Sequence, residues 1–120
     1  MLVVEDDADL RRLLVTVVRE AGFSVAEAGD GKRALELCAE QEPDLIVLDL
    51  DLPRLTGLEF LERHRRDHEC AGKVVVLTAL RFTDDERTAN RVDAVMPKPF
   101  LIDELVATVH RLLPAPGVFH

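Results

Sequence analysis

The chain has 120 residues, a length that fits one domain and leaves no room for two ordinary ones. Hydrophobic residues make up 48% of it, charged residues 32% and aromatic residues 4%, with no Trp or Tyr, a composition that indicates an aliphatic globular domain and excludes a disordered chain. The net charge of −8 argues against generic nucleic-acid binding, which requires a cationic face to neutralise phosphates.

Two further observations limit the cellular setting. No apolar segment approaches the ~20 residues needed to span a bilayer, and no basic leader precedes the first apolar segment. Cys38 and Cys70 lack metal-type spacing and are expected to be small, half-buried residues of a reduced compartment. We therefore expect a cytoplasmic protein that does not bind membranes.

The first half of the chain alternates apolar strands with helical segments. A strand over residues 1–4 is followed by three acids and then by a helix, which Asp7 or Asp9 is expected to cap and Gly22 to end. A second strand is predicted over residues 24–28, a helix after residue 31, and a third strand over residues 44–49. The apolar residues of the first helix recur at helical spacing: Leu10, Leu13, Leu14, Val17 and Val18.

The second half continues the alternation. Helices are predicted over residues 58–66 and 83–90, strands over residues 73–78 and 92–96, and a last helix thereafter. The inward residues of the helix over residues 58–66 are expected to be Leu58 and Leu61. The buried stripe of the last helix is expected to be Leu101, Leu105, Val109 and Leu112.

Five strands that alternate with helices predict an α/β fold with right-handed crossovers and a doubly wound, five-stranded parallel sheet. Residues 1–113 are expected to form this domain. Residues 114–120, which contain two prolines and a glycine, are expected to be a tail or the start of a linker.

Polar residues follow the apolar strands at their carboxyl ends. Glu5 and Asp6 follow the first strand, Asp49 ends the third, Thr78 ends the fourth, and Lys98 follows the fifth. Ligands of open parallel sheets bind outside the carboxyl ends of the strands. In a sheet of order 2-1-3-4-5, the first and third strands are neighbours, so the three carboxylates are expected to converge.

Three converging carboxylates repel one another unless a cation lies among them. Mg²⁺ satisfies this requirement, because it binds one or two carboxylates and completes its shell with water and phosphate oxygens. Thr78 adds a hydroxyl donor, and the Lys98 ammonium can pair with a phosphate oxygen. The pattern therefore predicts a site for a metal ion together with a phosphoryl group.

Several ordered motifs carry a resemblance to a known family. They are Leu-Val-Val-Glu-Asp-Asp at residues 2–7, Val-Leu-Asp-Leu-Asp-Leu-Pro at 47–53, Gly-Leu-Glu at 57–59, Val-Leu-Thr-Ala at 76–79 and Pro-Lys-Pro-Phe at 97–100. In this order, they make the chain resemble a response-regulator receiver domain of two-component signalling over residues 1–113. The resemblance implies a flavodoxin-like strand order, 2-1-3-4-5.

The resemblance also implies a role for each acid of the site. Asp49 would accept a phosphoryl group from a sensor histidine kinase or a phosphotransfer protein. The carboxylates of Asp6 and Asp49 and the backbone carbonyl of Asp51 would ligate Mg²⁺, with Mn²⁺ as an alternative ion. Glu5 would act on the metal through water.

The resemblance implies that the remaining motif residues bind the phosphoryl group and couple phosphorylation to a conformational change. Thr78, Ala79 and Lys98 would bind the phosphoryl group, and Pro99 would follow a cis peptide bond. Phosphorylation would switch an interaction with a downstream effector domain or protein, without direct nucleic-acid binding by this domain. No turnover enzyme is expected, although autodephosphorylation is compatible with this chemistry.

The chain departs from the family pattern around the output region. Thr56 replaces the acid that usually precedes the glycine at residue 57, and Val95 replaces the usual aromatic three residues before the lysine. Arg91-Val92 replaces a small Gly-Ala pair, and the segment from Thr78 to residue 98 is about two residues shorter than usual. We therefore predict a switch that uses Thr78 and helix rearrangement without an aromatic gate.

Two catalytic alternatives share some of these residues. A haloacid-dehalogenase-like phosphatase would use Asp49 as nucleophile and Asp51 as general acid, but in that family the acidic pair follows the lysine. A topoisomerase–primase metal site would combine Glu5 with Asp49 and Asp51, but it leaves Thr78 and the Lys98–Pro99 pair without a role.

A third alternative is a pseudo-receiver that serves as an interaction module independently of phosphorylation. The complete set of Glu5, Asp6, Asp49, Thr78 and Lys98 argues against it.

Overall fold

The computed structural model describes residues 1–51, 59–60, 62–63, 72–79, 85 and 91–113. Its elements are β1 (Leu2–Val4), α1 (Ala8–Glu20), β2 (Ala26–Ala28), α2 (Gly31–Glu40), β3 (Leu45–Asp49), β4 (Lys73–Thr78), β5 (Ala94–Pro97) and α5 (Ile102–Leu112). The strands form one parallel five-stranded sheet in the order β2-β1-β3-β4-β5. The predicted fold class and strand order are confirmed.

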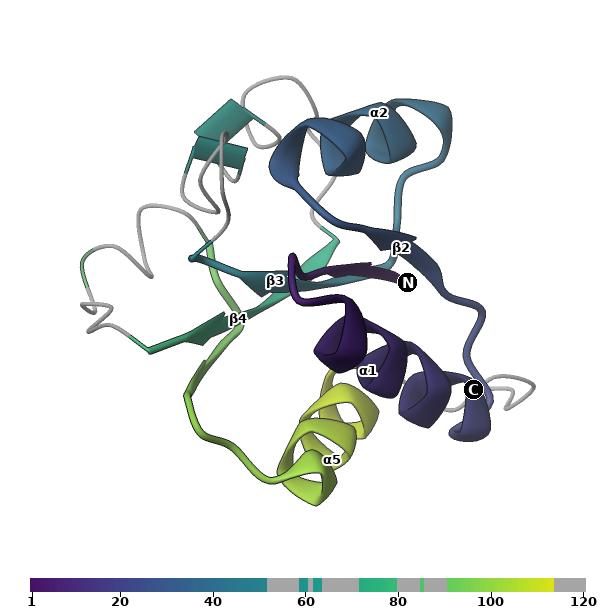
Figure 1. The fold of residues 1–120 in the computed structure, drawn as a ribbon, viewed down its shortest axis with the longest axis vertical. Coiled ribbons are helices and arrows are strands. Elements are labelled where there is room, and N and C mark those ends of the chain that lie inside the picture. The colour runs from purple at the N-terminus through teal and green to yellow at the C-terminus, as the bar shows by residue number, and fades with distance from the viewer. Residues whose placement is uncertain (52–58, 61, 64–71, 80–84, 86–90, 114–120) are drawn as a thin grey trace.

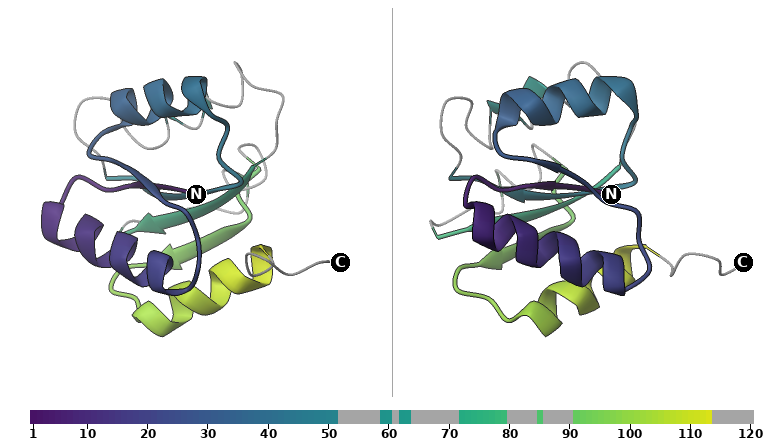
Figure 2. Two further views of the ribbon diagram at one scale, coloured as in Figure 1. Left: turned by 90° about the vertical axis from the view of Figure 1, so that its right-hand side faces the viewer. Right: turned by 45° about the vertical axis from the view of Figure 1, so that its right-hand side comes forward.

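Helices cover both faces of the sheet. Helices α1 and α5 lie on one face and α2 lies on the other (Figure 1, Figure 2). Phe60, which lies in a helical segment, is fully buried and packs in the same core as Ala34 and Cys38 of α2. Strand β3 is therefore buried from Leu45 to Asp49, as expected for the centre of a doubly wound parallel sheet.

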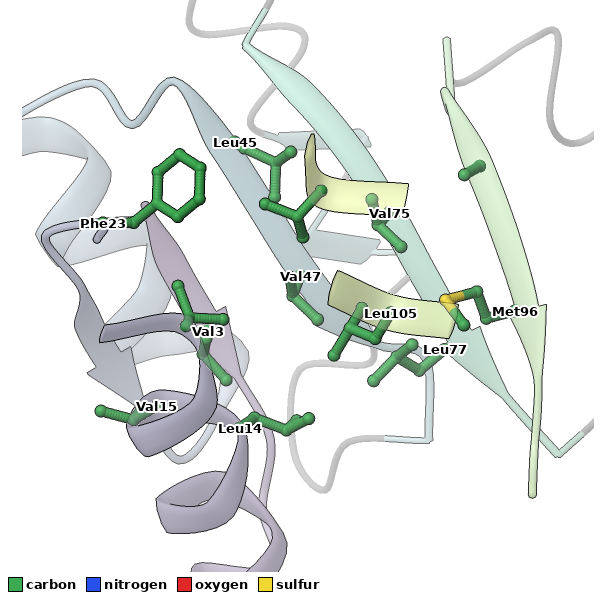
Figure 3. Packing of buried hydrophobic residues seen from close by; sticks show 13 residues of the cluster. Val3, Leu14, Val15, Phe23, Leu45, Val47, Val75, Leu77, Met96 and Leu105 are labelled. Atoms are coloured by element: carbon green, nitrogen blue, oxygen red, sulfur yellow. The ribbon is translucent and has the colours of Figure 1, made fainter. Parts of the chain in front are cut away.

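The core between the sheet and the α1–α5 layer consists of aliphatic side chains with few aromatics (Figure 3). Its members lie on alternate positions of the central strands and on the inner faces of the two helices. Those labelled in Figure 3 are Val3, Leu14, Val15, Phe23, Leu45, Val47, Val75, Leu77, Met96 and Leu105. This layer keeps the carboxyl ends of β1, β3 and β4 aligned at one edge.

Helix α1 begins and ends at the residues that the sequence marks. The Asp7 side chain is its N-cap and accepts hydrogen bonds from the backbone N–H groups of Asp9 (2.9 Å) and Leu10 (3.1 Å). Gly22 adopts a φ of 99°, a left-handed conformation that favours glycine after a helix. Of the two predicted caps, Asp7 is the one used.

Two apolar residues predicted to be inward are exposed. Leu13 of α1 is 46% exposed, whereas Val15, two residues further along the helix, is buried. Leu101 is 66% exposed because it precedes the first turn of α5 as its N-cap residue and does not share the helical period. The prediction of Leu105 and Val109 as core residues is confirmed.

The outer strands differ from their predicted bounds. Strand β2 begins at residue 26, two residues later than predicted, because it pairs only with the three-residue β1. Regular pairing of β5 begins at Ala94, because the Asp93 carboxylate accepts the Val74 N–H (2.8 Å) while the Asp93 N–H donates to the Val74 carbonyl (2.9 Å).

Some predictions fall outside the described residues. They concern Leu58, Leu61, Thr56, Cys70, most of the helix over residues 83–90 and the tail over residues 114–120. Across the described part of the chain, no helix is long and apolar enough to cross a membrane.

Adjacent leucines of α1 give a direct test of this packing. Leu14 is fully buried, so Leu14→Ala is expected to lower the free energy of unfolding by about 2–5 kcal/mol, through lost burial and a residual cavity. Leu13→Ala is the matched control and is expected to change it by only about 0.5 kcal/mol or less, as at most exposed positions. Urea unfolding followed by circular dichroism measures both. Equal losses for the two variants would contradict the orientation of α1.

Candidate functional site

The parallel register places the ends of neighbouring strands at the same height. Val4 of β1 pairs with Leu48 of β3, so the residues after both strands emerge side by side. Asp49 pairs with Leu77 of β4, and Thr78 pairs with Pro97 of β5. The sheet therefore brings residues distant in the sequence to one edge, as the sequence predicts.

An acidic cluster lies at this edge. Glu5, Asp6 and Asp49 each offer a carboxylate oxygen, and these oxygens lie within 4.8 Å of one another. Glu5 is only 2% exposed and Asp49 only 1%, whereas Asp6 is exposed to solvent. The cluster is thus buried on the protein side and open at Asp6.

Among the described residues, one cationic side chain forms an ion pair with a buried carboxylate of this cluster. The Lys98 ammonium lies 3.0 Å from Oδ2 of Asp49. The backbone N–H of Lys98 donates to the Thr78 carbonyl (2.8 Å), and the Lys98–Pro99 peptide bond is cis. The end of β5 is therefore joined to the end of β4, with the ammonium directed at the carboxylate and the Thr78 side chain buried nearby.

The two buried carboxyls have opposite pKa shifts. Burial, reinforced by the neighbouring Asp49 carboxylate, raises the pKa of Glu5 to about 8. Burial also opposes ionisation of Asp49, but hydrogen bonds from Glu5, from the Asp51 N–H and from Lys98 outweigh it, so the pKa of Asp49 lies below its ordinary value. At neutral pH, the pair therefore holds a proton on Glu5 and a negative charge on Asp49.

The neighbouring carboxylates also shift the pKa of Lys98. Burial disfavours its charged form, yet the Asp49 carboxylate more than offsets this effect, so the pKa of Lys98 is raised above its ordinary value. The ammonium is consequently charged at neutral pH. Asp49 is an ionised, oriented carboxylate that faces a fixed positive charge.

The cluster fits a hard divalent cation. Glu5 Oε2 is buried and accepts no hydrogen bond from a donor group among the residues that the structure describes. A buried oxygen of this kind, beside two further carboxylates, matches the oxygen ligands that Mg²⁺ and Mn²⁺ prefer. A divalent ion there would balance the negative charge that the Lys98 ammonium leaves uncompensated.

Asp51 joins the loop after β3 to the end of β4. Its backbone N–H donates to Oδ1 of Asp49 (2.9 Å), and its Oδ2 accepts from the Ala79 N–H (3.4 Å). These contacts orient Asp49 and occupy the Ala79 amide. A metal-ligand role for the Asp51 carbonyl stays a prediction.

Sequence reasoning overlooked one residue at the site. Arg11 of α1 reaches the end of β1 and donates to the Glu5 carbonyl. The only signal in the sequence was a basic pair, Arg11-Arg12, in the helix after the acidic triplet, a pattern equally typical of solvated helix side chains. Val95, at the position of the usual aromatic, is partly buried and packs against the α2-side core.

The comparisons with known proteins agree with this geometry. Residues 1–110 match the family model described as response regulator receiver domain. The response regulator MprA of Mycolicibacterium vanbaalenii is 40% identical over 116 residues, which cover 94% of this chain and 49% of MprA. The chain thus spans about half the length of the curated relatives that it matches.

Solved structures give the same result. The response regulator TrrA of Thermotoga maritima, solved in complex with Mg²⁺-BeF, is 33% identical with a TM-score of 0.81, over 93% of this chain and 96% of that one. A DNA-binding response regulator of the LuxR family from Staphylococcus aureus is 31% identical with a TM-score of 0.81, over 92% and 96%. The chain therefore belongs to the response regulator receiver domain family.

Proposed function

We propose that this chain accepts a phosphoryl group on Asp49 in a magnesium-dependent reaction. The observation that carries the proposal is the pairing of a buried, ionised Asp49 with Lys98 at 3.0 Å, beside two further carboxylates. The haloacid-dehalogenase-like, topoisomerase–primase and pseudo-receiver alternatives are not favoured by the family match. The chain acts as a signalling domain and not as a turnover enzyme.

The proposed step is a displacement at phosphorus. An Asp49 carboxylate oxygen forms the new P–O bond, while the P–N bond of a donor phosphohistidine breaks and the electron pair stays on the imidazole nitrogen. Hydrogen bonds from the Asp51 N–H and Lys98 hold Asp49 in place for this attack. The low pKa of Asp49 keeps it ionised without a general base.

The phosphoryl oxygens would meet three donors from the ends of two strands, β4 and β5. Thr78 supplies a hydroxyl, Ala79 a backbone N–H once Asp51 releases it, and Lys98 its ammonium. Bound by Asp6, Asp49 and the Asp51 carbonyl, with Glu5 acting through water, Mg²⁺ would neutralise charge on the transferring group. Mn²⁺ offers the same ligand preference.

The partners follow from the family and are part of the proposal. The donor would be a sensor histidine kinase or a phosphotransfer protein, and the recipient of the signal an effector domain or protein. Residues 1–113 would be the receiver and residues 114–120 the start of a linker. With Val95 at the usual aromatic position, switching would depend on Thr78 and helix movement, in the cytoplasm.

The first test is magnesium-dependent labelling by acetyl phosphate. Wild type is expected to gain one phosphoryl group by intact mass, through loss of acetate from the donor, and EDTA is expected to prevent the gain. Asp49→Asn should abolish labelling because an amide is not a nucleophile. The matched control, Asp44→Asn, removes an exposed acid before the opposite end of β3 and should label like wild type.

Other outcomes would contradict the proposal in distinct ways. Labelling of Asp49→Asn would place the acceptor elsewhere. Catalytic turnover of phosphomonoesters would favour the phosphatase alternative. Absence of any adduct on the wild type would leave the chain as an interaction module.

A further inference from the structure

We propose that Arg11 is a positioning residue that orients the metal-binding carboxylates through the backbone of β1. This inference rests on the proposed magnesium-dependent function. Arg11 contacts neither the proposed nucleophile nor a donor to the phosphoryl group. Its contribution would be to the affinity of the site for Mg²⁺, through the direction in which Glu5 and Asp6 project.

The first contact is with the peptide unit between the two acids. Nη1 of Arg11 donates to the Glu5 carbonyl oxygen at 2.9 Å. That carbonyl belongs to the planar peptide that joins Glu5 to Asp6, so a hydrogen bond to it fixes the orientation of the plane. The other side of Glu5 is fixed by its own N–H, which donates to the Ala28 carbonyl at 3.0 Å.

Asp6 depends on this backbone orientation more than its neighbours do. Glu5 Oε1 accepts from the Asp7 N–H at 3.4 Å, and Asp49 is held by Lys98 and the Asp51 N–H. Within the described part of the chain, by contrast, the exposed Asp6 carboxylate makes no hydrogen bond or ion pair. The backbone is therefore what positions the Cα–Cβ bond of Asp6, and Arg11 holds the peptide that precedes it.

The guanidinium is itself held in place by β2 and the residue that follows it. Nε of Arg11 lies 3.4 Å from Oε1 of Glu27, and the Arg11 side chain is only 22% exposed. A Cβ atom on Gly29 would lie 3.1 Å from Nη1, so the absence of a side chain at Gly29 leaves the space that the guanidinium occupies. The edge strand β2 thus supports the Arg11 contact with β1.

The test compares Mg²⁺ affinities of the metal-free protein. The chain contains no Trp or Tyr, so calorimetry or amide NMR titration with Mg²⁺ alone is the suitable readout. Arg11→Gln is expected to weaken binding by about tenfold, at the lower end of the losses seen when a partner that orients metal ligands is removed. The matched control is Arg12→Gln, which removes the same charge from the adjacent exposed residue and should bind like wild type.

A second variant disturbs the guanidinium without removing it. Gly29→Ala displaces Nη1 by a few tenths of an ångström and is expected to weaken Mg²⁺ binding by less than the about tenfold loss expected when the guanidinium is removed. In the Arg11→Gln background, the same change should have no further effect, because residues in contact are non-additive. A merely structural role would lower the stability of the variants without producing this coupling in affinity.

Labelling by acetyl phosphate separates affinity from chemistry. Arg11→Gln should label slowly at low Mg²⁺ and at the wild-type rate at saturating Mg²⁺.

Wild-type affinity in Arg11→Gln, or an equal effect of Gly29→Ala in both backgrounds, would overturn the inference while the proposed function stands. If Arg11→Gln does not fold, unchanged affinity in Gly29→Ala overturns it. A wild type without Mg²⁺ affinity would overturn both.

Discussion

Replacing Lys98 with Met is expected to slow phosphoryl transfer to Asp49 by about 10²-fold, the cost of one preorganised donor to developing charge. It should also lower the stability of the metal-free protein by about 1–3 kcal/mol, because a buried hydrogen-bond acceptor loses its partner. Asp49 is almost fully buried, so its carboxylate is poorly hydrated once the ammonium that lies 3.0 Å from it is removed. Both effects arise from the same missing charge.

The variant should also change the protonation of the site. Without the ammonium, the pKa of Asp49 is expected to rise, since Lys98 is among the groups that keep it low against the effect of burial. Mg²⁺ should recover part of the lost stability, because a divalent cation compensates the same carboxylates. The rate of labelling is expected to recover less, because the ammonium also contacts the phosphoryl group.

Lys73→Met is the matched control for this variant. Lys73 lies 4.0 Å from Asp93 at the opposite end of the sheet, and its side chain is 47% exposed. An exposed pair of this kind contributes only about 0–1 kcal/mol. Urea unfolding and acetyl phosphate labelling of the two variants measure the contrast. Wild-type labelling by Lys98→Met would show that Lys98 is not part of the phosphoryl site.

Replacing Glu5 with Gln is expected to remove a pH dependence of stability in the metal-free protein. The pKa of Glu5 is about 8 in the folded state, against 4.5 for an unperturbed glutamate. Between these values, the unfolded chain has released the proton and the folded protein retains it. Stability contributed by the raised pKa is therefore fully present below pH 4.5 and is lost as the pH rises towards 8.

The loss has a limiting slope set by one proton, about 1.4 kcal/mol per pH unit. Glutamine does not titrate, so the variant should lose less stability than wild type between pH 5 and pH 8. Asp49 and Lys98 do not contribute in this window, because the pKa of Asp49 is lowered from 3.8 and that of Lys98 is raised from 10.5. The difference between wild type and variant therefore isolates Glu5.

The measurement is urea unfolding in EDTA at a series of pH values. Glu20→Gln, which changes an exposed acid at the end of α1, should keep the wild-type slope. Saturating Mg²⁺ should flatten the wild-type slope, because a bound cation favours ionised Glu5. Parallel pH profiles for wild type and Glu5→Gln would show that Glu5 is ionised in the folded protein at neutral pH.

The fold was accessible from the sequence because its signals are local and repeated. Apolar runs bounded by turns predicted the strands, and their alternation with helical periodicity predicted the sheet. The buried face of α1 was harder to predict, because its apolar stripe includes both Leu13 and Leu14. Only the packing of the helix on the sheet shows that Leu14 is buried and Leu13 is exposed. Leu101 was misplaced because the apolar period does not show where the first turn of α5 begins.

The candidate site was also predictable only in part from the sequence. Residues at strand ends, such as Glu5, Asp49 and Lys98, were predictable because a parallel sheet collects them at one edge. Their protonation was not, since the opposite pKa shifts of Glu5 and Asp49 depend on burial and on hydrogen bonds. Arg11 was missed because its partner is a backbone carbonyl, which no side-chain pattern encodes.

The central claim is that Asp49 itself becomes the phosphorylated residue in the presence of Mg²⁺. Borohydride reduces an aspartyl phosphate to homoserine, so peptide mass spectrometry after acetyl phosphate treatment locates the acceptor directly. We predict homoserine at residue 49 in samples with Mg²⁺ and its absence in samples with EDTA. Homoserine at another acid, or labelling of residue 49 that is independent of Mg²⁺, would contradict the account.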